Sequence, residues 1–173
     1  MLGASMKTIR KQRGFTMMEV LVSVLIVSFG MLGIAATLFT ANRSATSSYV
    51  RQQAVQDAYD ILDRMRANHT VAAVAGGSYT TSSVPSSAPS PNCSTSTCTG
   101  TQMAAYDVWQ WETNVSTNLP QGVGSVTIAA GSTNTYTVTV SVTWSDQAGS
   151  SAFTPQGATA SNTTQTYTVV SAL

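Results

Sequence analysis

The residues that could carry out catalysis are few, and their spacing does not favour it. The chain has one histidine, His69, which supports neither a Ser/His/Asp arrangement nor a four-ligand metal site. Asp107 and Glu112 are five residues apart, so they do not share a helix face and paired-carboxylate chemistry is not indicated. No glycine-rich phosphate loop occurs. We therefore predict that the protein is not an enzyme and uses no cofactor or metal.

Glu19 is the residue whose type and position do suggest chemistry, because this carboxylate stands at the threshold of a long apolar run. A carboxylate near a membrane core is costly and usually has a partner. The apolar segment offers none, since Arg13 lies upstream of it. Cleavage after Gly14 would create a new amine at Phe15, which could pair with Glu19 of a neighbouring subunit. The alternative is a carboxylate that rests at the membrane interface, at little energetic cost.

Charge is scarce and unevenly placed along the chain. Only 9% of the 173 residues are charged, against roughly 25% in an ordinary soluble domain. Four basic residues fall in the first 14, and the remainder has 4 arginines against 7 acids, a net charge of −3. This pattern is typical of a targeting leader and argues against a nucleic-acid binder, which needs a basic excess. We expect a cleaved, cytoplasmic leader over residues 1–14, with Met1 or Met6 as the true start.

An uncharged run of 22 residues extends from Val20 to Ala41. At about 1.5 Å per residue, such a helix covers roughly the 30 Å hydrocarbon core of a bilayer. The positive-inside rule then places the leader in the cytoplasm and the rest of the chain outside the inner membrane. A buried core helix would be shorter, and a secretory signal would end in a small-residue cleavage site after the run. We therefore expect a transmembrane and assembly helix over 15–41 and a globular head over 42–173.

The segment that joins the leader to the apolar run reads Arg13-Gly14-Phe15-Thr16-Met17-Met18-Glu19-Val20. It resembles the class III signal of type IV pilins and pseudopilins. The resemblance implies that a prepilin peptidase cuts between Gly14 and Phe15 and methylates Phe15. It also implies that Glu19 pairs with the terminal amine of another subunit during assembly. Many major pilins have a proline in this helix; here the weak points are Gly30 and Gly33, at about 1 kcal/mol each, which could instead permit close helix packing.

Apolar residues then recur at three- and four-residue spacing, which predicts that the helix continues as an amphipathic stripe packed on the head. Asp60 and Arg64 form an i,i+4 pair with the acid first, which helps a helix slightly. We interpret Arg43, Arg51, Arg64 and Arg66 as a solvated helix face. The stripe consists of Tyr49, Val50, Ala54, Ala58, Ile61, Leu62 and Met65.

Residues 76–100 are rich in Gly, Ser, Thr and Pro and are expected to form a loop. The loop contains both cysteines, Cys93 and Cys98. In a periplasmic or surface domain, two cysteines indicate a disulfide, and this spacing is not that of a C-x-x-C redox motif. Closing so short a loop should stabilise the fold by less than the roughly 3 kcal/mol expected for a 15-residue loop.

A second helix is predicted over 101–119, with Thr99 or Thr101 as its cap. Its apolar face comprises Ala104, Val108, Trp111, Val115 and Leu119.

The period then changes to two, which predicts strands over 125–130, 136–144 and 163–170. A turn over 131–134 and a polar connection over 145–161 separate them. The fold class is therefore α+β, and its order of elements resembles that of the pilins. A long N-terminal helix, first membrane-spanning and then amphipathic, packs on a small antiparallel sheet with a second short helix.

One further stretch contains Ala105-Tyr106-Asp107, Trp111, Leu119-Pro120 and Gly122, followed by strands. This stretch resembles the PilV type of minor pilin. This subtype implies a structural and assembly-priming subunit that enters a type IV pilus near its tip. The first alternative is a pseudopilin of type II secretion, and the second is a module whose 76–101 loop binds a surface or ligand.

The resemblance also implies partners and a location. The expected partners are other minor and major pilins, the prepilin peptidase, the inner-membrane assembly machinery and a tip adhesin. Membrane lipid surrounds the helix before assembly, and no nucleic acid is expected. The precursor is expected to cross the inner membrane once, and the assembled subunit to lie in the pilus at the cell surface.

Overall fold

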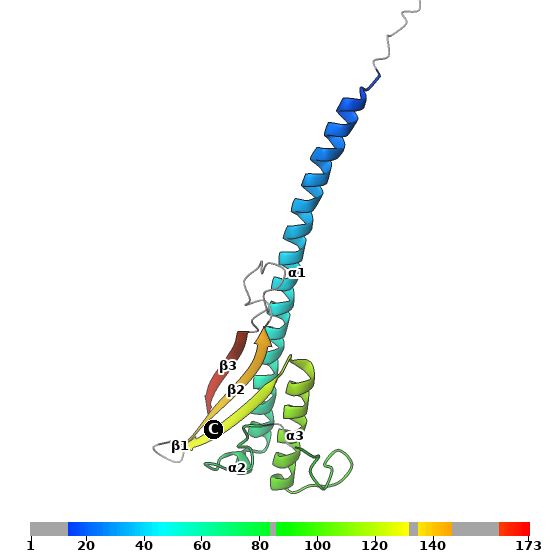
Figure 1. Cartoon of the computed structure of the whole chain (residues 1–173). Helices are drawn as coiled ribbons and strands as arrows, with labels where there is room; N and C mark the ends of the chain where they lie inside the picture. The colour runs from blue at the N-terminus through cyan, green and yellow to red at the C-terminus, as the bar shows by residue number, and fades with distance from the viewer. Residues whose placement is uncertain (1–13, 84–85, 132–134, 147–162) are drawn as a thin grey trace, which may run out of the picture. The chain divides into compact units, whose positions relative to one another are not determined.

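The computed structural model describes residues 14–83, 86–131, 135–146 and 163–173. The leader up to Arg13, with Met6, therefore lies outside the described residues, as do most of the expected turn and the expected polar connection. Figure 1 shows the elements in chain order: α1 Met17–Ala67, α2 His69–Ala72, α3 Gly100–Asn118, β1 Val123–Ala130, β2 Tyr136–Asp146 and β3 Thr163–Ala172.

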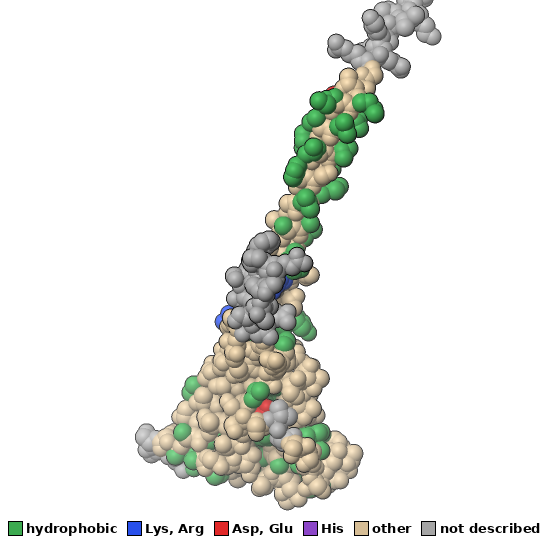
Figure 2. Space-filling view, in the orientation of Figure 1, with side chains coloured by type: hydrophobic (Ala, Val, Ile, Leu, Met, Phe, Trp, Pro, Cys, Tyr) green, Lys and Arg blue, Asp and Glu red, His purple; other side chains and the backbone are tan. Residues whose placement is uncertain are grey.

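The chain divides into two compact units, Met1–Ala41 and Asn42–Leu173. In the first unit, every described side chain is exposed, and hydrophobic side chains cover the helix on the face seen in Figure 2. By length and composition alone, α1 is the described helix that could cross a membrane, and the window that meets this criterion is wholly unburied.

The hydroxyl groups in the apolar part of α1 are satisfied within the helix. Ser23 Oγ donates to the carbonyl of Glu19 (2.6 Å) and Ser28 Oγ to that of Val24 (2.7 Å). Thr37 and Thr40 donate in the same way to carbonyls three and four residues earlier. Because each hydroxyl proton has an acceptor, these residues add little to the cost of placing the helix in hydrocarbon.

The second unit contains a three-stranded antiparallel sheet in the order β1-β2-β3, which confirms the predicted meander. Strand β2 alternates as predicted, and the side chains on one of its faces are buried. The register places Val140 between Val126 of β1 and Val169 of β3. The opposite face carries threonine and serine, with cross-strand hydroxyl contacts at Ser141–Thr168 (3.0 Å) and Thr143–Thr166 (3.2 Å). The buried β2 residues are Val138, Val140, Val142 and Trp144.

The core of this unit lies where the C-terminal part of α1, α3 and the sheet meet. Most residues of each predicted helix stripe are buried there, and Val50 is partly buried against the core. Tyr49 of α1 is 67% exposed, so its assignment to the packed stripe is wrong. Thr99 caps α3 in a capping box with Gln102, as one of the two predicted caps. The buried helix residues are Ala54, Ala58, Ile61, Leu62 and Met65 of α1, and Ala104, Val108, Trp111, Val115 and the flanking Leu119 of α3.

Two glycines allow β1 to approach α3 closely. A Cβ added at Gly122 would lie 2.2 Å from the carbonyl oxygen of Val115, and one at Gly124 would lie 2.4 Å from the indole of Trp111. Neither contact is compatible with a side chain. The two glycines that follow α3 in the sequence are therefore explained by packing as well as by the end of the helix.

Candidate processing and assembly site

The candidate processing residues lie just before the first turn of α1. Gly14 and Phe15 are exposed and precede the helix, which begins at Met17. Thr16 holds this start, because the amide of Glu19 is 3.0 Å from the Thr16 carbonyl oxygen and 3.3 Å from its Oγ1. The order Thr-x-x-Glu is that of a capping box, so part of the segment that resembles a processing signal also forms the start of the helix.

Glu19 lies in the first turn of α1 and is exposed. Unpaired amides at a helix N-terminus carry partial positive charge, which favours a carboxylate at this position. Across the residues that the structure describes, no ion pair involves Glu19. The local structure therefore places a carboxylate in the first turn of an apolar helix, and within the described residues only the helix dipole stabilises its charge.

The glycines of this unit have no packing role within the described chain. A Cβ added at Gly14, Gly30 or Gly33 would meet no atom within 4 Å. Gly14 in particular is not required by the fold around it. A requirement for glycine at these positions would therefore come from another molecule.

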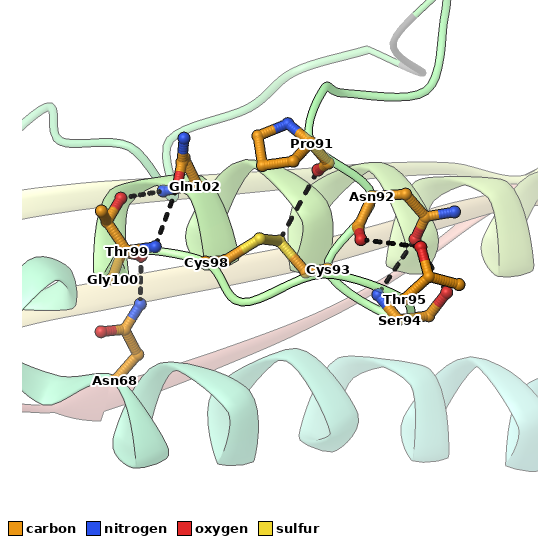
Figure 3. Close-up of a disulfide and its surroundings, with 10 residues drawn as sticks. All are labelled: Asn68, Pro91, Asn92, Cys93, Ser94, Thr95, Cys98, Thr99, Gly100 and Gln102. Carbon is orange, nitrogen blue, oxygen red and sulfur yellow. Dashed lines mark hydrogen bonds between the residues drawn. A yellow bond between two sulfur atoms is a disulfide. The ribbon is translucent and has the colours of Figure 1, made fainter.

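The predicted disulfide is present in the head, between Cys93 and Cys98, with an S–S distance of 2.02 Å. Figure 3 shows it beside the start of α3, where Thr99 and Gln102 form the capping box. The Asn68 side chain donates to the Gly100 carbonyl at 2.7 Å. The disulfide loop is thus attached to the chain immediately after α1, which gives the two cysteines a local structural role.

The structure brings Asp107 into a polar network that the sequence did not reveal. The Tyr79 hydroxyl donates to Asp107 Oδ2 (2.7 Å), and Arg64 lies 3.3 Å from Asp107 Oδ1. Burial, together with the hydrogen bond to Asp107, raises the pKa of Tyr79. Arg64 also pairs with Asp60 as predicted (3.0 Å) and donates to Gln110. The interpretation of Arg64 as part of a solvated face is therefore wrong, because its guanidinium links α1 to α3.

Glu112 is fully buried and has a separate role from Asp107. Its Oε2 accepts from the Gly124 amide (3.1 Å) and its Oε1 from the Thr81 hydroxyl (3.3 Å). Burial raises the pKa of Glu112 and also that of Asp57, whose Oδ2 has no hydrogen-bond partner. Asp107 and Glu112 each link separate segments of the head and do not converge on a shared reaction centre.

No described group of three or more His, Cys, Asp and Glu side chains could hold a metal ion.

The signal for the buried acids was present in the sequence. Asp107 and Glu112 each adjoin a stripe residue of α3 (Val108 and Trp111, respectively), so they lie at the border of the packed face.

Comparison with protein families gives two adjoining matches. Residues 9–35 match the prokaryotic N-terminal methylation motif, and residues 36–109 match a model described as type IV pilin Tt1218. No curated protein and no solved structure matches the chain. The α+β architecture agrees with these matches, which together support a type IV pilin.

Proposed function

We propose that the chain is a minor pilin, a structural and assembly-priming subunit of a type IV pilus. It enters the filament near the tip after a prepilin peptidase cleaves it between Gly14 and Phe15. The observation that carries this proposal is the position of Glu19. It lies five residues after Gly14, in the first turn of an exposed apolar helix, within the segment that matches the methylation motif.

The precursor crosses the inner membrane once, with its leader in the cytoplasm and its head in the periplasm. The distribution of basic residues supports this orientation, because four of them precede Phe15 and membrane proteins keep such residues on the cytoplasmic side. Lipid covers the apolar side chains at this stage. After assembly, neighbouring helices replace the lipid, and the head is displayed at the cell surface.

Cleavage changes the electrostatics at the start of the helix. It removes the basic leader and leaves a positive amine on Phe15, which is then methylated. In the filament core this amine lies close to Glu19 of an adjoining subunit, where the low dielectric strengthens the attraction between the two charges. The pair sets the axial register of one subunit on the next, and the exposed apolar side chains of α1 supply lateral packing. Gly30 and Gly33, which have open space around them, permit close approach of a second helix.

The partners follow from this role. The prepilin peptidase and the inner-membrane assembly machinery act on the precursor, and other minor and major pilins surround the mature helix. A separate tip adhesin completes the filament where adhesion is needed. Within this proposal the protein acts by assembling and not by catalysis.

A pseudopilin of a type II secretion system is the alternative, because its signal segment and fold follow the same plan. Deletion of the gene separates the two proposals. Loss of surface pili with normal secretion supports the pilus subunit, whereas loss of secretion with normal pili supports the pseudopilin.

The test of the proposal is the variant Glu19→Ala, with Ser23→Ala as its matched control one turn along the same helix. Glu19→Ala should leave membrane insertion and cleavage intact and should largely abolish incorporation, measured by immunoblotting sheared filaments. Ser23→Ala removes a hydroxyl that bonds only to its own helix and should incorporate normally. Normal incorporation of Glu19→Ala would contradict the proposed pairing.

A further inference from the structure

A cleft in the head lies between the loop that follows α2 and one exposed side of α3. It has a volume of about 490 Å³, which is within the range of small-molecule sites, about 300–1,000 Å³. Hydroxyl-bearing side chains from the loop form much of the lining, and the ring of Trp109 contributes from the helix. The lining includes Ser78, Thr80, Ser82, Ser87 and Trp109.

Among the residues that the structure describes, none that lines this cleft is charged. A second cavity of about 440 Å³ differs in this respect, because Arg64 and Asp107 line it and are already paired with each other. A ligand of the uncharged cleft would gain nothing from a formal charge and would lose hydration on entering. The cleft is therefore suited to a neutral molecule.

The hydroxyls of the cleft are also uncommitted. In the described chain, the hydroxyls of Ser78, Thr80, Ser82 and Ser87 have no hydrogen-bond partner. Several hydroxyls elsewhere are used internally: those of Ser116 and Thr117 donate to α3 carbonyls, and those of the apolar part of α1 donate to their own helix. Each free hydroxyl can donate one hydrogen bond and accept two, so the cleft offers several donors and acceptors on one wall.

Trp109 supplies an aromatic wall that the core does not need. It is half-buried and lies off the packed stripe of α3, with its ring centroid 5.7 Å from that of Tyr106. Trp111, in contrast, is fully buried and donates its Nε1 to the Asp57 carbonyl at 2.7 Å. A partly exposed indole on a rigid helix offers a large apolar face at small cost in conformational entropy.

The loop side of the cleft is held in place before any ligand arrives. Thr81 exchanges two backbone hydrogen bonds with Val126 of β1 (2.8 and 3.1 Å), and its hydroxyl donates to Glu112. The hydroxyls next to Thr81 therefore extend from an anchored segment, which reduces the ordering cost of binding.

We propose that this cleft binds a neutral carbohydrate, with one sugar face stacked on Trp109 and the sugar hydroxyls bonded to the serine and threonine hydroxyls of the loop. Sugars combine an apolar C–H face with a ring of groups that both donate and accept, and the cleft presents the complement of each. This binding function is independent of the filament role proposed above, because it requires only the folded head.

The test uses the purified full chain in a detergent with an amine-oxide head group, since sugar-based detergents would compete. Saturation-transfer NMR is recorded with short neutral oligosaccharides of glucose, galactose and N-acetylglucosamine, and with an oligogalacturonate as the anionic probe. At least one neutral probe should show saturation transfer, and the anionic probe should show none. Absence of transfer from every neutral probe, or binding of the anionic probe alone, would overturn the proposal.

Variants separate the two walls of the cleft. Trp109→Ala should lower the affinity for the neutral probe about tenfold or more, and so should the double variant Ser82→Ala with Ser87→Ala, which keeps the fold if Trp109→Ala does not. The double variant Ser116→Ala with Thr117→Ala is the matched control and should bind normally, because these hydroxyls do not line the cleft. Undiminished binding by the Ser82/Ser87 variant would overturn the proposal.

Discussion

The apolar unit and the head differ in the exposure of their apolar side chains and in the range of their hydrogen bonds. From Gly14 to Ala41 every side chain is exposed, including large ones such as Phe29 and Leu32, and polar groups bond only within their own turn of helix. In the head, many apolar side chains are buried in a shared core, and hydrogen bonds link residues far apart in sequence. The Trp111–Asp57 bond, for example, spans 54 residues.

This difference shows which unit is complete on its own. The head buries most of its apolar stripe residues in a core shared by its own helices and sheet. The apolar unit has hydrophobic residues on all sides of the helix, which is the pattern of a helix that is surrounded by lipid or by other helices. A single chain cannot supply that environment, so the function of this unit depends on other molecules.

The largest expected effect comes from breaking the head alone. Trp111→Ala should lower the free energy of unfolding by about 3–5 kcal/mol, because it empties a fully buried site and removes the bond to Asp57. Urea titration in detergent, followed by near-UV circular dichroism, measures the loss. The far-UV helical signal of the apolar unit should persist.

Trp109→Ala is the control for this change in the same helix. Because Trp109 is only half-buried, its loss should reduce stability by about 1 kcal/mol or less. Equal losses for the two variants would mean that the head is not organised around Trp111.

An aspartate introduced into the apolar unit should have an intermediate effect, whereas an aspartate introduced into the head should have almost none. Leu32→Asp should disfavour membrane insertion by about 2.5–3.5 kcal/mol while leaving the unfolding of the head unchanged. Thr127→Asp, on an exposed position of β1, should alter neither quantity appreciably. Membrane fractionation and urea titration measure the two effects, and a Leu32→Asp chain that inserted normally would refute the contrast between the units.

The smallest expected effect is the pH dependence of the head. Burial raises the folded pKa of Asp57 and Glu112 above their ordinary values of 3.8 and 4.5. The folded state therefore binds more protons than the unfolded state above those values. The contribution of these acids to stability is full below them and declines as the pH rises through the raised folded values.

Asp57→Asn and Glu112→Gln should each flatten this decline. The measurement is the free energy of unfolding of each variant and of the parent chain at about pH 4 and about pH 8. An unchanged difference between the two pH values in both variants would show that neither acid is responsible.

Much of the fold was predictable because its signals are local. The stripes of α1 and α3 repeat every three or four residues and the strands every two, so each element could be identified from its own sequence. The boundaries of the strands were less accurate. Strand β2 extends to Asp146 and β3 to Ala172, because pairing between neighbours continues beyond the alternating apolar residues.

The features that the sequence did not predict depend on distant partners. Tyr79 lies in a Gly/Ser-rich segment and is nevertheless fully buried, since Asp107 and Asn68 satisfy its hydroxyl. Arg64 faces α3 because Asp107 and Gln110 of that helix bind its guanidinium. The short helix α2 and the bridge from Thr81 to Val126 were also missed, because periodicity within a segment contains no information about them.

The residues of the candidate processing and assembly site, in contrast, lie within one short segment. Gly14, Phe15 and Glu19 could be identified from the sequence because their spacing resembles a processing signal, and the structure adds the capping by Thr16. Their roles stay predictions, since the molecules that would act on them are different chains.

The most direct test of the account is mass spectrometry of the N-terminus of the protein isolated from cells that assemble filaments. The account predicts a chain that begins at Phe15 and carries one methyl group on its amine. A chain that retained Lys7, Arg10, Lys11 and Arg13 in front of Gly14 would contradict it, because Glu19 would then have no new amine to pair with.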